Sequence, residues 1–373
     1  MALISKYIKE QNFADYEALK AHFNEKKVSV KNNNLIYMLM FTDDSDWSDP
    51  VIRECNGVIF EKDTNALLHY SFSKAYDGLE TENHAADEHV KDVFHAKEAD
   101  LVNSTLEVFF EGTLMKVFYH NDKWNVSTSH HLDARKNFWT SKRSYFELFC
   151  ESIKYAFDKT FDEFTEKCDK NYCYSYLLQH PENLMVIRNE ILGIIPVNKV
   201  HLETRQEYQL NEGEFIVTKK YHELEDERPL GENFMLYVRD DKKKVTARVK
   251  FLSPKFMEAM YYRGNSPNIL MSYIAHWYDE EAVKKFKSFF PKEESNFTKF
   301  DMQFAQMCDD IHGFYIRRHI KHEMNLDVPP KYNKSLYQLH KQYLRTRKPI
   351  RRDDVINLVA HLKPRSVIWL MKD

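Results

Sequence analysis

The sequence has little glycine. Only 8 of its 373 residues are glycine, about 2% where soluble proteins average about 7%. No two of these glycines lie closer together than 18 residues. The phosphate loop GxxxxGK[ST] and the dinucleotide motif GxGxxG need clustered glycines, because their backbone N–H groups must approach a phosphate closely. The sequence therefore excludes both motifs, and any nucleotide must be held by side chains.

Cysteine and long apolar runs are also scarce. The five cysteines are an odd number and include no CxxC pair, so we expect reduced, mostly buried thiols rather than a disulfide framework or a structural zinc site. No apolar run approaches the roughly 18 residues that span a bilayer. Charged residues are scattered through the first 20 positions, where a signal peptide would have its apolar stretch. We expect a soluble, cytoplasmic protein with no membrane association.

What the sequence does contain is apolar surface and an uneven charge. Hydrophobic residues make up 43% of the chain, with 26 Phe and 22 Tyr, which is enough for a large core. The net charge is −3. Residues 315–373 carry 14 Lys+Arg and 5 Asp+Glu, a net charge of +9. The rest of the chain carries 40 Lys+Arg and 52 Asp+Glu, a net charge of −12. A basic segment on an acidic body is typical of polyanion binding, although a solvated helix face is the simpler alternative.

Residues 1–252 are expected to form an α+β domain in which antiparallel pairing dominates. An amphipathic helix is expected over 12–26 and a second helix over 136–161, where apolar residues recur at three- and four-residue steps. A strand is expected over 34–42, and hairpins over 57–72, 113–129, 184–197 and 233–252.

Residues 253–373 are expected to form an all-helical, basic second domain. Two helical faces can be read from the spacing of apolar residues: Leu336, Leu339 and Tyr343, then Val355, Leu358, Val359 and Leu362. Pro330, Pro349 and Pro364 are expected at helix boundaries.

Seven short blocks carry most of the functional information. They are RECNGVIFE (53–61), YSFSKAYD (70–77), VFFEGTLMKVFY (108–119), YSYLLQHPENLMV (174–186), GENFMLYV (231–238), ARVKFLSPKF (247–256) and YRGNSP (262–267). In this order and spacing the chain resembles the bacteriophage-type RNA ligase 1 family of covalent nucleotidyltransferases, whose blocks run roughly ECRGIIFE, RPFxKFFN, KxDGTL, FExVxPxNRIV, EGFVV and a basic RxK or KxK.

The resemblance implies an antiparallel-sheet nucleotidyltransferase domain of the ATP-grasp-like ligase type. In that family, ATP and Mg²⁺ bind between two antiparallel sheets. A lysine amine attacks the α-phosphate, and AMP then passes to an RNA 5′-phosphate before a 3′-hydroxyl displaces it. This chemistry needs an amine with a lone pair, cations around the phosphate and carboxylates for the metal.

Three positions depart from the family pattern. Phe109 stands at the lysine of KxDG, Asn56 replaces the arginine of ECRG, and Leu177 replaces a glutamate. A phenylalanine has no lone pair, so the resemblance implies no catalytic residue and no metal site in this chain. Two other lysines are candidate nucleophiles, one in KEAD (97–100) and Lys116 in the following strand, but neither has the motif around it.

Other positions match the family and are candidates for nucleotide binding: Lys74, Glu111, Gly112, Glu232, Arg248 and Lys250. Arg248 and Lys250 are two apart on an expected strand, so they face the same way. Alternatively, Arg248 and Lys250 lie at the solvated end of a strand and bind no nucleotide. The alternative for Glu111 is a plain ion pair with Arg248 or Lys250.

Basic residues interleaved with tyrosines in the second domain are candidates for RNA binding, since phosphates pair with cations and unpaired bases stack on aromatic rings. They are Arg317, Arg318, Lys341, Arg345, Arg347, Lys348, Arg351 and Arg352. The leading hypothesis is an RNA-binding, catalytically degenerate ligase-like protein. The alternatives are a working ATP-dependent RNA ligase with a non-standard nucleophile, which would use ATP and Mg²⁺, and an interaction subunit of a protein assembly without RNA affinity. A viral source, suggested by low glycine and high Phe, Tyr and Lys, would place the protein in the host cytoplasm.

Overall fold

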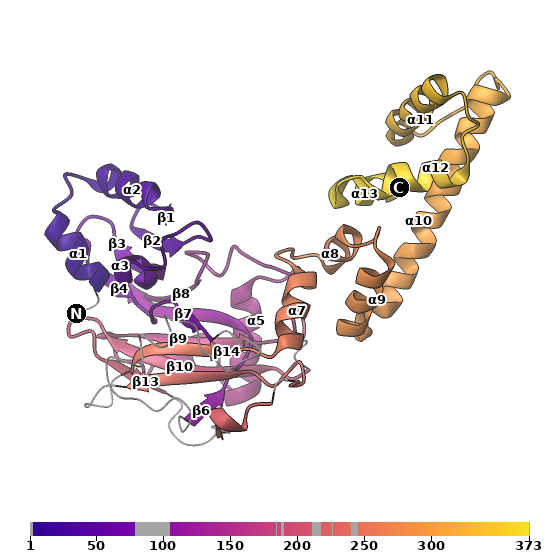
Figure 1. Ribbon diagram of the computed structural model, residues 1–373. Helices are drawn as coiled ribbons and strands as arrows, with labels where there is room; N and C mark the ends of the chain where they lie inside the picture. The colour runs from indigo at the N-terminus through magenta and orange to yellow at the C-terminus, as the bar shows by residue number, and fades with distance from the viewer. Residues whose placement is uncertain are drawn as a thin grey trace. The chain divides into compact units, whose positions relative to one another are not determined.

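The chain divides into two compact units, Met1–Met257 and Glu258–Asp373 (Figure 1). The computed structural model describes residues 3–78, 105–183, 185–187, 190–210, 218–225, 227–239 and 245–372. The boundary between the units falls within helix α7 (Pro254–Arg263), whereas the sequence placed it just before that helix. The first unit is mixed α and β with antiparallel sheets, and the second contains helices and loops but no strand among its described residues.

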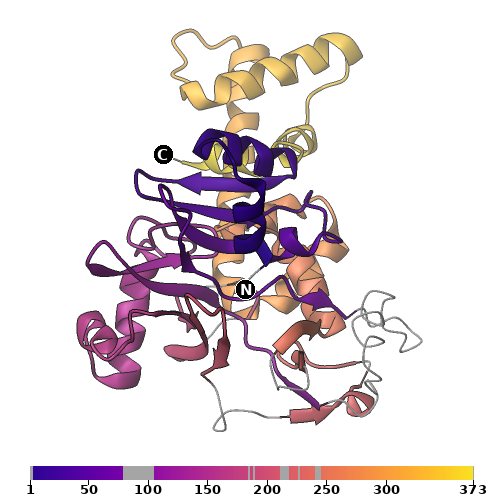
Figure 2. The same ribbon diagram turned by 90° about the vertical axis from the view of Figure 1, so that its left-hand side faces the viewer.

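The first unit opens with a small sheet covered by helices. Strands β1 (Val28–Asn32), β2 (Ile36–Phe41), β3 (Asn56–Glu61) and β4 (Leu67–His69) pair in that order, and α3 (Pro50–Glu54) precedes β3. Helices α1 (Leu3–Gln11) and α2 (Tyr16–Glu25) share a core with this sheet (Figures 1 and 2). The single helix expected over 12–26 is wrong at its start, because Asp15 caps α2 by accepting from the Ala18 N–H at 2.8 Å.

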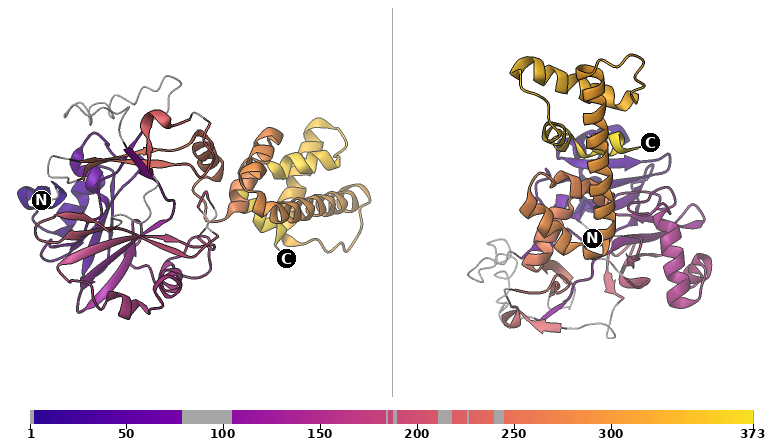
Figure 3. Two further views of the ribbon diagram at one scale, coloured as in Figure 1. Left: turned by 90° about the horizontal axis from the view of Figure 1, so that it is seen from below. Right: turned by 90° about the vertical axis from the view of Figure 1, so that its right-hand side faces the viewer.

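Two five-stranded sheets build the rest of the first unit. One has the order β11-β10-β9-β7-β8 and the other β12-β6-β13-β14-β5. The strands of the first are β7 (Thr113–His120), β8 (Lys123–Thr128), β9 (Tyr172–Gln179), β10 (Gly193–His201) and β11 (Glu207–Gln209). Those of the second are β5 (Tyr76–Asp77), β6 (Thr105–Val108), β12 (Thr218–Lys220), β13 (Phe234–Arg239) and β14 (Val245–Phe251). The two sheets lie across from each other in Figure 3, left. Every pair is antiparallel except β14 with β5, which confirms the expected dominance of antiparallel pairing.

The hairpin turns test the sequence expectations. Asn121 and Asp122 join β7 to β8 with φ values of 53° and 57°, the left-handed conformations that a tight hairpin turn requires and that these residue types tolerate. The hairpin expected over 184–197 is wrong, because β10 pairs with β9. The segment 185–187 just before it belongs to no strand. Hairpins β3–β4 and β13–β14 are confirmed; the residues that link β13 to β14, including the lysine turn 242–244, lie outside the described residues.

Helix α5 (Tyr145–Phe157) packs on the sheet that contains β9 and β10, and α6 (Phe161–Thr165) follows it. The helix expected over 136–161 begins nine residues later than its apolar spacing suggested. Ser144 and Glu147 form a capping box that fixes the start of α5.

The second unit is a helical bundle with one core. Its helices are α8 (Ile269–Ala275), α9 (Glu280–Phe289), α10 (Glu294–Tyr315), α11 (Asn333–Thr346), α12 (Arg352–Ala360) and α13 (Pro364–Met371). Short 3₁₀ turns cover Pro291–Glu293 and Pro330–Tyr332, and a π-helical turn, η4 (Ile316–Ile320), extends α10. Helix α10 packs against α11, α12 and α13 (Figure 1). The expected apolar faces of α11 and α12 both lie in this core, so that expectation is confirmed. None of the described helices combines the length and apolarity needed to cross a bilayer.

Candidate nucleotide site and basic surface

Phe109 lies just after β6, at the position where the resemblance expects a nucleophile. It is half-buried, and its N–H donates to the Asn233 carbonyl at 2.8 Å. Gly112, three residues on, lies against β9. A Cβ added to Gly112 would come within 2.6 Å of the Leu178 carbonyl oxygen and 2.9 Å of the Leu177 Cγ. Glycine is therefore required here by the close approach of β9, and the leucine at the expected glutamate position packs against it.

Glu111 binds backbone amides. Its two carboxylate oxygens accept hydrogen bonds from the N–H groups of Val186, at 2.9 Å, and Ile187, at 2.6 Å. Among the described residues, no ion pair joins it to Arg248 or Lys250. The alternative in which Glu111 pairs with one of these cations is therefore wrong, because the loop that follows β9 supplies its hydrogen-bond donors.

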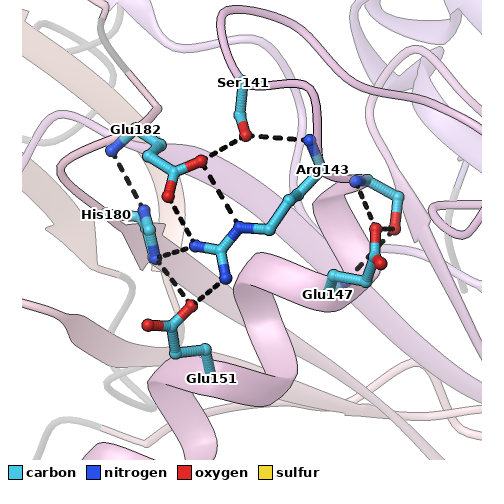
Figure 4. A network of polar contacts seen from close by, with 7 residues as sticks. Ser141, Arg143, Glu147, Glu151, His180 and Glu182 are labelled. Atoms are coloured by element: carbon cyan, nitrogen blue, oxygen red, sulfur yellow. Dashed lines mark hydrogen bonds and ion pairs between the residues drawn. The ribbon is translucent and has the colours of Figure 1, made fainter.

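That loop is held in place by a network of charged side chains (Figure 4). Arg143 binds Glu182 at 2.7 Å and also Glu151. Ser141 donates to Glu182 at 2.5 Å, and these hydrogen bonds hold the pKa of the Glu182 carboxyl below its usual range. The buried His180 accepts the Glu182 N–H at Nδ1. The network fixes the start of the loop whose later amides bind Glu111.

Arg248 is buried and paired with a carboxylate. Its guanidinium binds Glu207 of β11, and their side chains are only 6% and 9% exposed. The Asn198 side chain donates to the same carboxylate oxygen at 2.8 Å, and the Arg248 Cζ lies 4.6 Å from the ring centroid of Phe72. The solvated strand end weighed as an alternative is therefore wrong for Arg248. The charge that the resemblance assigns to a phosphate is instead matched by Glu207.

Lys250 and Lys74 come together around one carboxylate. Lys250 is opposite Asp77 in the β14–β5 register. The Lys74 Nζ lies 3.4 Å from Asp77 Oδ2 and 4.6 Å from the ring centroid of Trp47. Burial lowers the pKa of the Lys250 amine; Asp77 opposes this shift, and Lys74 adds to it. Asp77 thus pairs with Lys74 and lies opposite Lys250, the second cation of the predicted nucleotide site, in the strand register.

Arg53 joins this cluster, although no motif position predicts a role for it. Its Cζ lies 3.6 Å from the ring centroid of Tyr76, and its guanidinium donates to the carbonyls of Lys74 at 2.7 Å and Trp47 at 3.2 Å. Burial lowers its pKa. The blocks at 53–61 and 70–77 contain Arg53 and Tyr76, but their contact depends on how β5 is placed and could not be read from spacing.

The other two polar positions of the predicted site differ in exposure. Glu232 is exposed in the turn before β13, and its carbonyl accepts from Arg228 Nε at 3.2 Å. Asn56 is half-buried, and its amide donates to the Phe72 carbonyl at 3.2 Å. The structure thus places Lys74 near Lys250, and Glu111 beside Gly112. Arg248 is instead paired with Glu207, which lies outside the motifs.

Lys116 is enclosed in the protein. It is fully buried, and its Nζ donates to the backbone carbonyls of Asn56 and Gly57. Burial lowers the pKa of this amine to about 7. A Cβ on Gly57, whose φ is +66°, would lie 2.6 Å from this Nζ. Lys116 therefore occupies a closed space beside β3 rather than an open site. The other lysine considered, in KEAD (97–100), lies outside the described residues.

The predicted RNA-binding cations fall into two groups. Arg317 pairs with Glu323 at 2.7 Å, Arg352 pairs with Asp309 at 2.5 Å, and Arg318 donates to Asn333. The remaining five are exposed and form no ion pair with any described residue: Lys341, Arg345, Arg347, Lys348 and Arg351.

These five cations belong to a stretch without acids. Residues 328–352 contain eight Lys+Arg and no Asp or Glu. On α11, Tyr337 is 70% exposed and Leu344 is 50% exposed, and helical spacing puts Lys341 between them on the same side. We call this side, together with the following basic loop, the basic face.

Comparisons with known proteins give distant viral relatives. The chain matches no known protein-family profile. It is 25% identical over 142 residues to an immediate-early protein ICP-46 homolog of Invertebrate iridescent virus 3, a match that covers 38% of this chain and 31% of that protein. It is 20% identical over 337 residues to the ICP-46 homolog of Invertebrate iridescent virus 6, covering 82% of this chain and 71% of that protein. The match to the first of these relatives thus spans less than a third of its length.

Among solved structures, the chain is similar to one assigned as an ATP-dependent DNA ligase of Aquifex aeolicus. The TM-score is 0.40 at 12% identity, over 92% of this chain and 86% of that chain.

Proposed function

We propose that this chain is a ligase-like nucleotidyltransferase protein that binds RNA and does not form a lysyl-adenylate. The observation that carries the proposal is the residue at the nucleophile position of its motif, Phe109. Attack on an α-phosphate needs a lone pair on a nitrogen or oxygen, and a phenyl ring has none. The motif assignment rests on the order and spacing of the seven sequence blocks.

The charged groups around this position do not fit ATP and Mg²⁺ as reactants. Arg248 is neutralised by the buried Glu207, and Glu111 is bound by two backbone amides. A transition state for adenylyl transfer needs cations aimed at the developing negative charge. Within the described residues, no group of three or more His, Cys, Asp or Glu side chains could hold a metal ion.

A working ligase with another nucleophile is the competing function. Its best candidate, Lys116, has a pKa of about 7 and so carries a lone pair at neutral pH. However, it is fully buried and donates to two carbonyl oxygens. An amine in that position cannot reach a nucleotide without opening the contacts between β3 and β7, so the structure does not favour this function.

The basic face of the second unit is the proposed RNA-binding surface. RNA phosphates attract exposed cations that have no acidic partner, and unpaired bases stack on exposed aromatic rings. Lys341, Arg345 and Lys348 supply the charge, and Tyr337 supplies a ring. The viral relatives support a viral origin, for which the site of action would be the host cytoplasm.

An adenylylation assay tests the first half of the proposal. The full-length protein is incubated with α-labelled ATP and Mg²⁺ and analysed on a denaturing gel. We expect no labelled protein band. A covalent, acid-stable AMP adduct would show that a nucleophile survives and would overturn the proposal.

Filter binding with single-stranded RNA at several salt concentrations tests the second half. In Arg345→Gln/Arg347→Gln/Lys348→Gln, we expect RNA affinity to fall about tenfold or more and the salt dependence to weaken, because each lost phosphate contact removes counterion release. The matched control Lys255→Gln/Lys284→Gln/Lys299→Gln changes three other exposed lysines and should bind as the parent does. Equal affinities in both triple variants would overturn the assignment of RNA binding to the basic face, and absence of RNA binding by the parent protein would instead favour the interaction subunit.

A further inference from the structure

One end of the sheet formed by β7 to β11 carries aromatic side chains on every strand. Tyr119 of β7 is opposite Trp124 of β8, and their ring centroids lie 5.5 Å apart. Tyr172 of β9 is opposite His201 of β10, with ring centroids 4.9 Å apart. Tyr208 of β11 lies 6.0 Å from the Tyr172 ring. We call these five rings the aromatic row.

The strand register puts the whole aromatic row on one face of the sheet. Val117 of β7 is opposite Tyr174 of β9, and Lys199 of β10 is opposite Tyr208 of β11. These pairs link the strands of the row, because residues two apart on a strand point to the same face and so do residues directly opposite each other.

Helices α5 and α6 cover the neighbouring part of this face. Tyr174 and Tyr176 of β9 are buried in a core that they share with Phe149 of α5. At the start of the same strand, Tyr172 is only partly buried, as are the rings from β7, β8 and β10, and Tyr208 is 36% exposed. The aromatic row is therefore the part of the face that the helices leave accessible to solvent.

Two lysines lie among the rings of the row. The Lys170 Nζ is 4.2 Å from the ring centroid of Tyr119 and 3.0 Å from its hydroxyl oxygen. The Lys199 Nζ is 5.0 Å from the ring centroid of Tyr172 and 5.7 Å from that of Tyr208. Cations and aromatic rings thus alternate across the sheet.

The charges of these lysines are available to a ligand. Neither Lys170 nor Lys199 forms an ion pair with any described residue. The acid next to Lys170 in the chain, Asp169, accepts the Asn171 N–H at 2.9 Å.

Rings interleaved with unpaired cations match single-stranded RNA, whose bases offer faces for stacking and whose phosphates offer negative charge. An exposed cation–π contact is weaker than the stacking of a base on an aromatic ring. A base can therefore replace a lysine on its ring, while the flexible lysine side chain turns toward a phosphate.

We propose that the aromatic row, with Lys170 and Lys199, is a second RNA-binding surface that takes unpaired bases. Tyr208 and Tyr172 stack on bases, and the two lysines bind the phosphates between them. Duplex RNA binds weakly here, because its bases are already stacked on one another. This surface rests on the proposed function, in which RNA is the ligand, but it shares no residue with the basic face or with the predicted nucleotide site.

Filter binding of the full-length protein with two single-stranded probes tests the proposal. One probe is an unstructured RNA, and the other is an oligomer of equal length made of abasic ribose-phosphate units. In Tyr208→Ala we expect the affinity for the RNA to fall at least about fivefold, because a stacking contact is lost, and the affinity for the abasic oligomer to stay unchanged. Tyr208→Phe keeps the ring and is the matched control, which should bind both probes as the parent does.

The lysines give a second test that does not depend on the folding of Tyr208→Ala. Lys170→Gln/Lys199→Gln should lower the affinity for the RNA about fivefold and weaken its salt dependence, because phosphate contacts are lost. The control Lys9→Gln/Lys136→Gln changes two exposed lysines of the first unit outside the row and should bind as the parent does.

Three results would overturn the proposal. Unchanged RNA affinity in both Tyr208→Ala and Lys170→Gln/Lys199→Gln would remove this surface and leave the basic face as the RNA-binding surface. Equal affinity of the parent for the two probes would show that its rings do not stack on bases. Absence of RNA binding by the parent would overturn the proposed function as well, so that failure is distinguishable from the first two.

Discussion

Arg248 of β14 and Glu207 of β11 form a buried ion pair that connects the two five-stranded sheets. The resemblance to RNA ligases assigns Arg248 to a phosphate. Its carboxylate partner comes from a short edge strand outside the seven sequence blocks, so only the fold brings the two together.

Because of this pair, we expect replacement of one partner to destabilise the protein far more than replacement of both. Glu207→Ala leaves a buried guanidinium without its partner and should lower the free energy of unfolding by about 3–5 kcal/mol. Arg248→Met/Glu207→Leu removes both charges and should cost much less, since well-packed apolar pairs can replace buried ion pairs. Urea unfolding followed by circular dichroism measures both. A double variant as unstable as Glu207→Ala would contradict the interpretation.

Lys116 predicts stability that rises with pH. Its pKa is about 7 in the folded protein and about 10.4 in an unfolded chain, so between these values the unfolded state binds the extra proton. The free energy of unfolding should therefore increase from about pH 7 to pH 10, by roughly 1 kcal/mol per pH unit from this group. Lys116→Met should remove that part of the slope. Urea unfolding at several pH values compares the two proteins, and identical slopes would show that Lys116 does not titrate as the structure indicates.

The stacked histidines of the second unit predict acid sensitivity. The rings of His319 and His340 lie 4.1 Å apart with an interplanar angle of 14°. Burial lowers the pKa of His319, and His340, Arg318 and His322 lower it further. Because the folded pKa is depressed, the stabilisation present above the unfolded pKa of about 6.5 is lost as the pH falls below it.

The measurement is the thermal midpoint of unfolding at pH 7.5 and pH 5.5. His340→Gln removes the stacked ring that lowers the pKa of His319 and should show a smaller drop between these pH values than the parent. His361→Gln, at an exposed histidine after α12, is the control and should behave as the parent. A drop in His340→Gln as large as the parent's would mean that the stacked pair is not the acid-sensitive group.

Restoring the motif lysine should not restore chemistry. In Phe109→Lys, Leu177 still packs against Gly112 and offers no carboxylate for a metal, and Arg248 is still bound to Glu207, so one of the cations expected at the α-phosphate is already neutralised. We expect no labelled protein after incubation with α-labelled ATP and Mg²⁺. Adduct formation by this single variant would show that the pocket has lost only its nucleophile.

The sequence predicted several local features correctly because their causes are local. The turn at Asn121 and Asp122 follows from residues that tolerate positive φ, and the apolar faces of α11 and α12 follow from helical spacing. The prediction from sequence was wrong where one local pattern is compatible with two structures. The helix over 12–26 needed the cap at Asp15 to be recognised, and the strand at Gly193–His201 pairs with β9 and β11 rather than folding back on residues 185–187.

The candidate site was predictable in its residue types but not in its pairings. Block order placed Phe109 at the nucleophile position and drew attention to Arg248, Lys250 and Lys74. Spacing could not show that Glu207 neutralises Arg248, that Asp77 joins Lys74 and Lys250, or that Lys116 points into a closed interior. Ion pairs across sheets depend on which strands become neighbours, and that depends on long-range packing.

By itself, the amino-acid sequence determined the composition of this protein's two parts: an antiparallel body, and a helical tail with an excess of positive charge. These follow from residue identity and from periods of two and 3.6 residues, which any short segment carries. The tertiary structure alone decided which charges are free and which are already matched. Arg317 and Arg352 meet acids while Lys341 and Arg345 do not, because pairing over several ångströms is set by distances that only the folded chain defines.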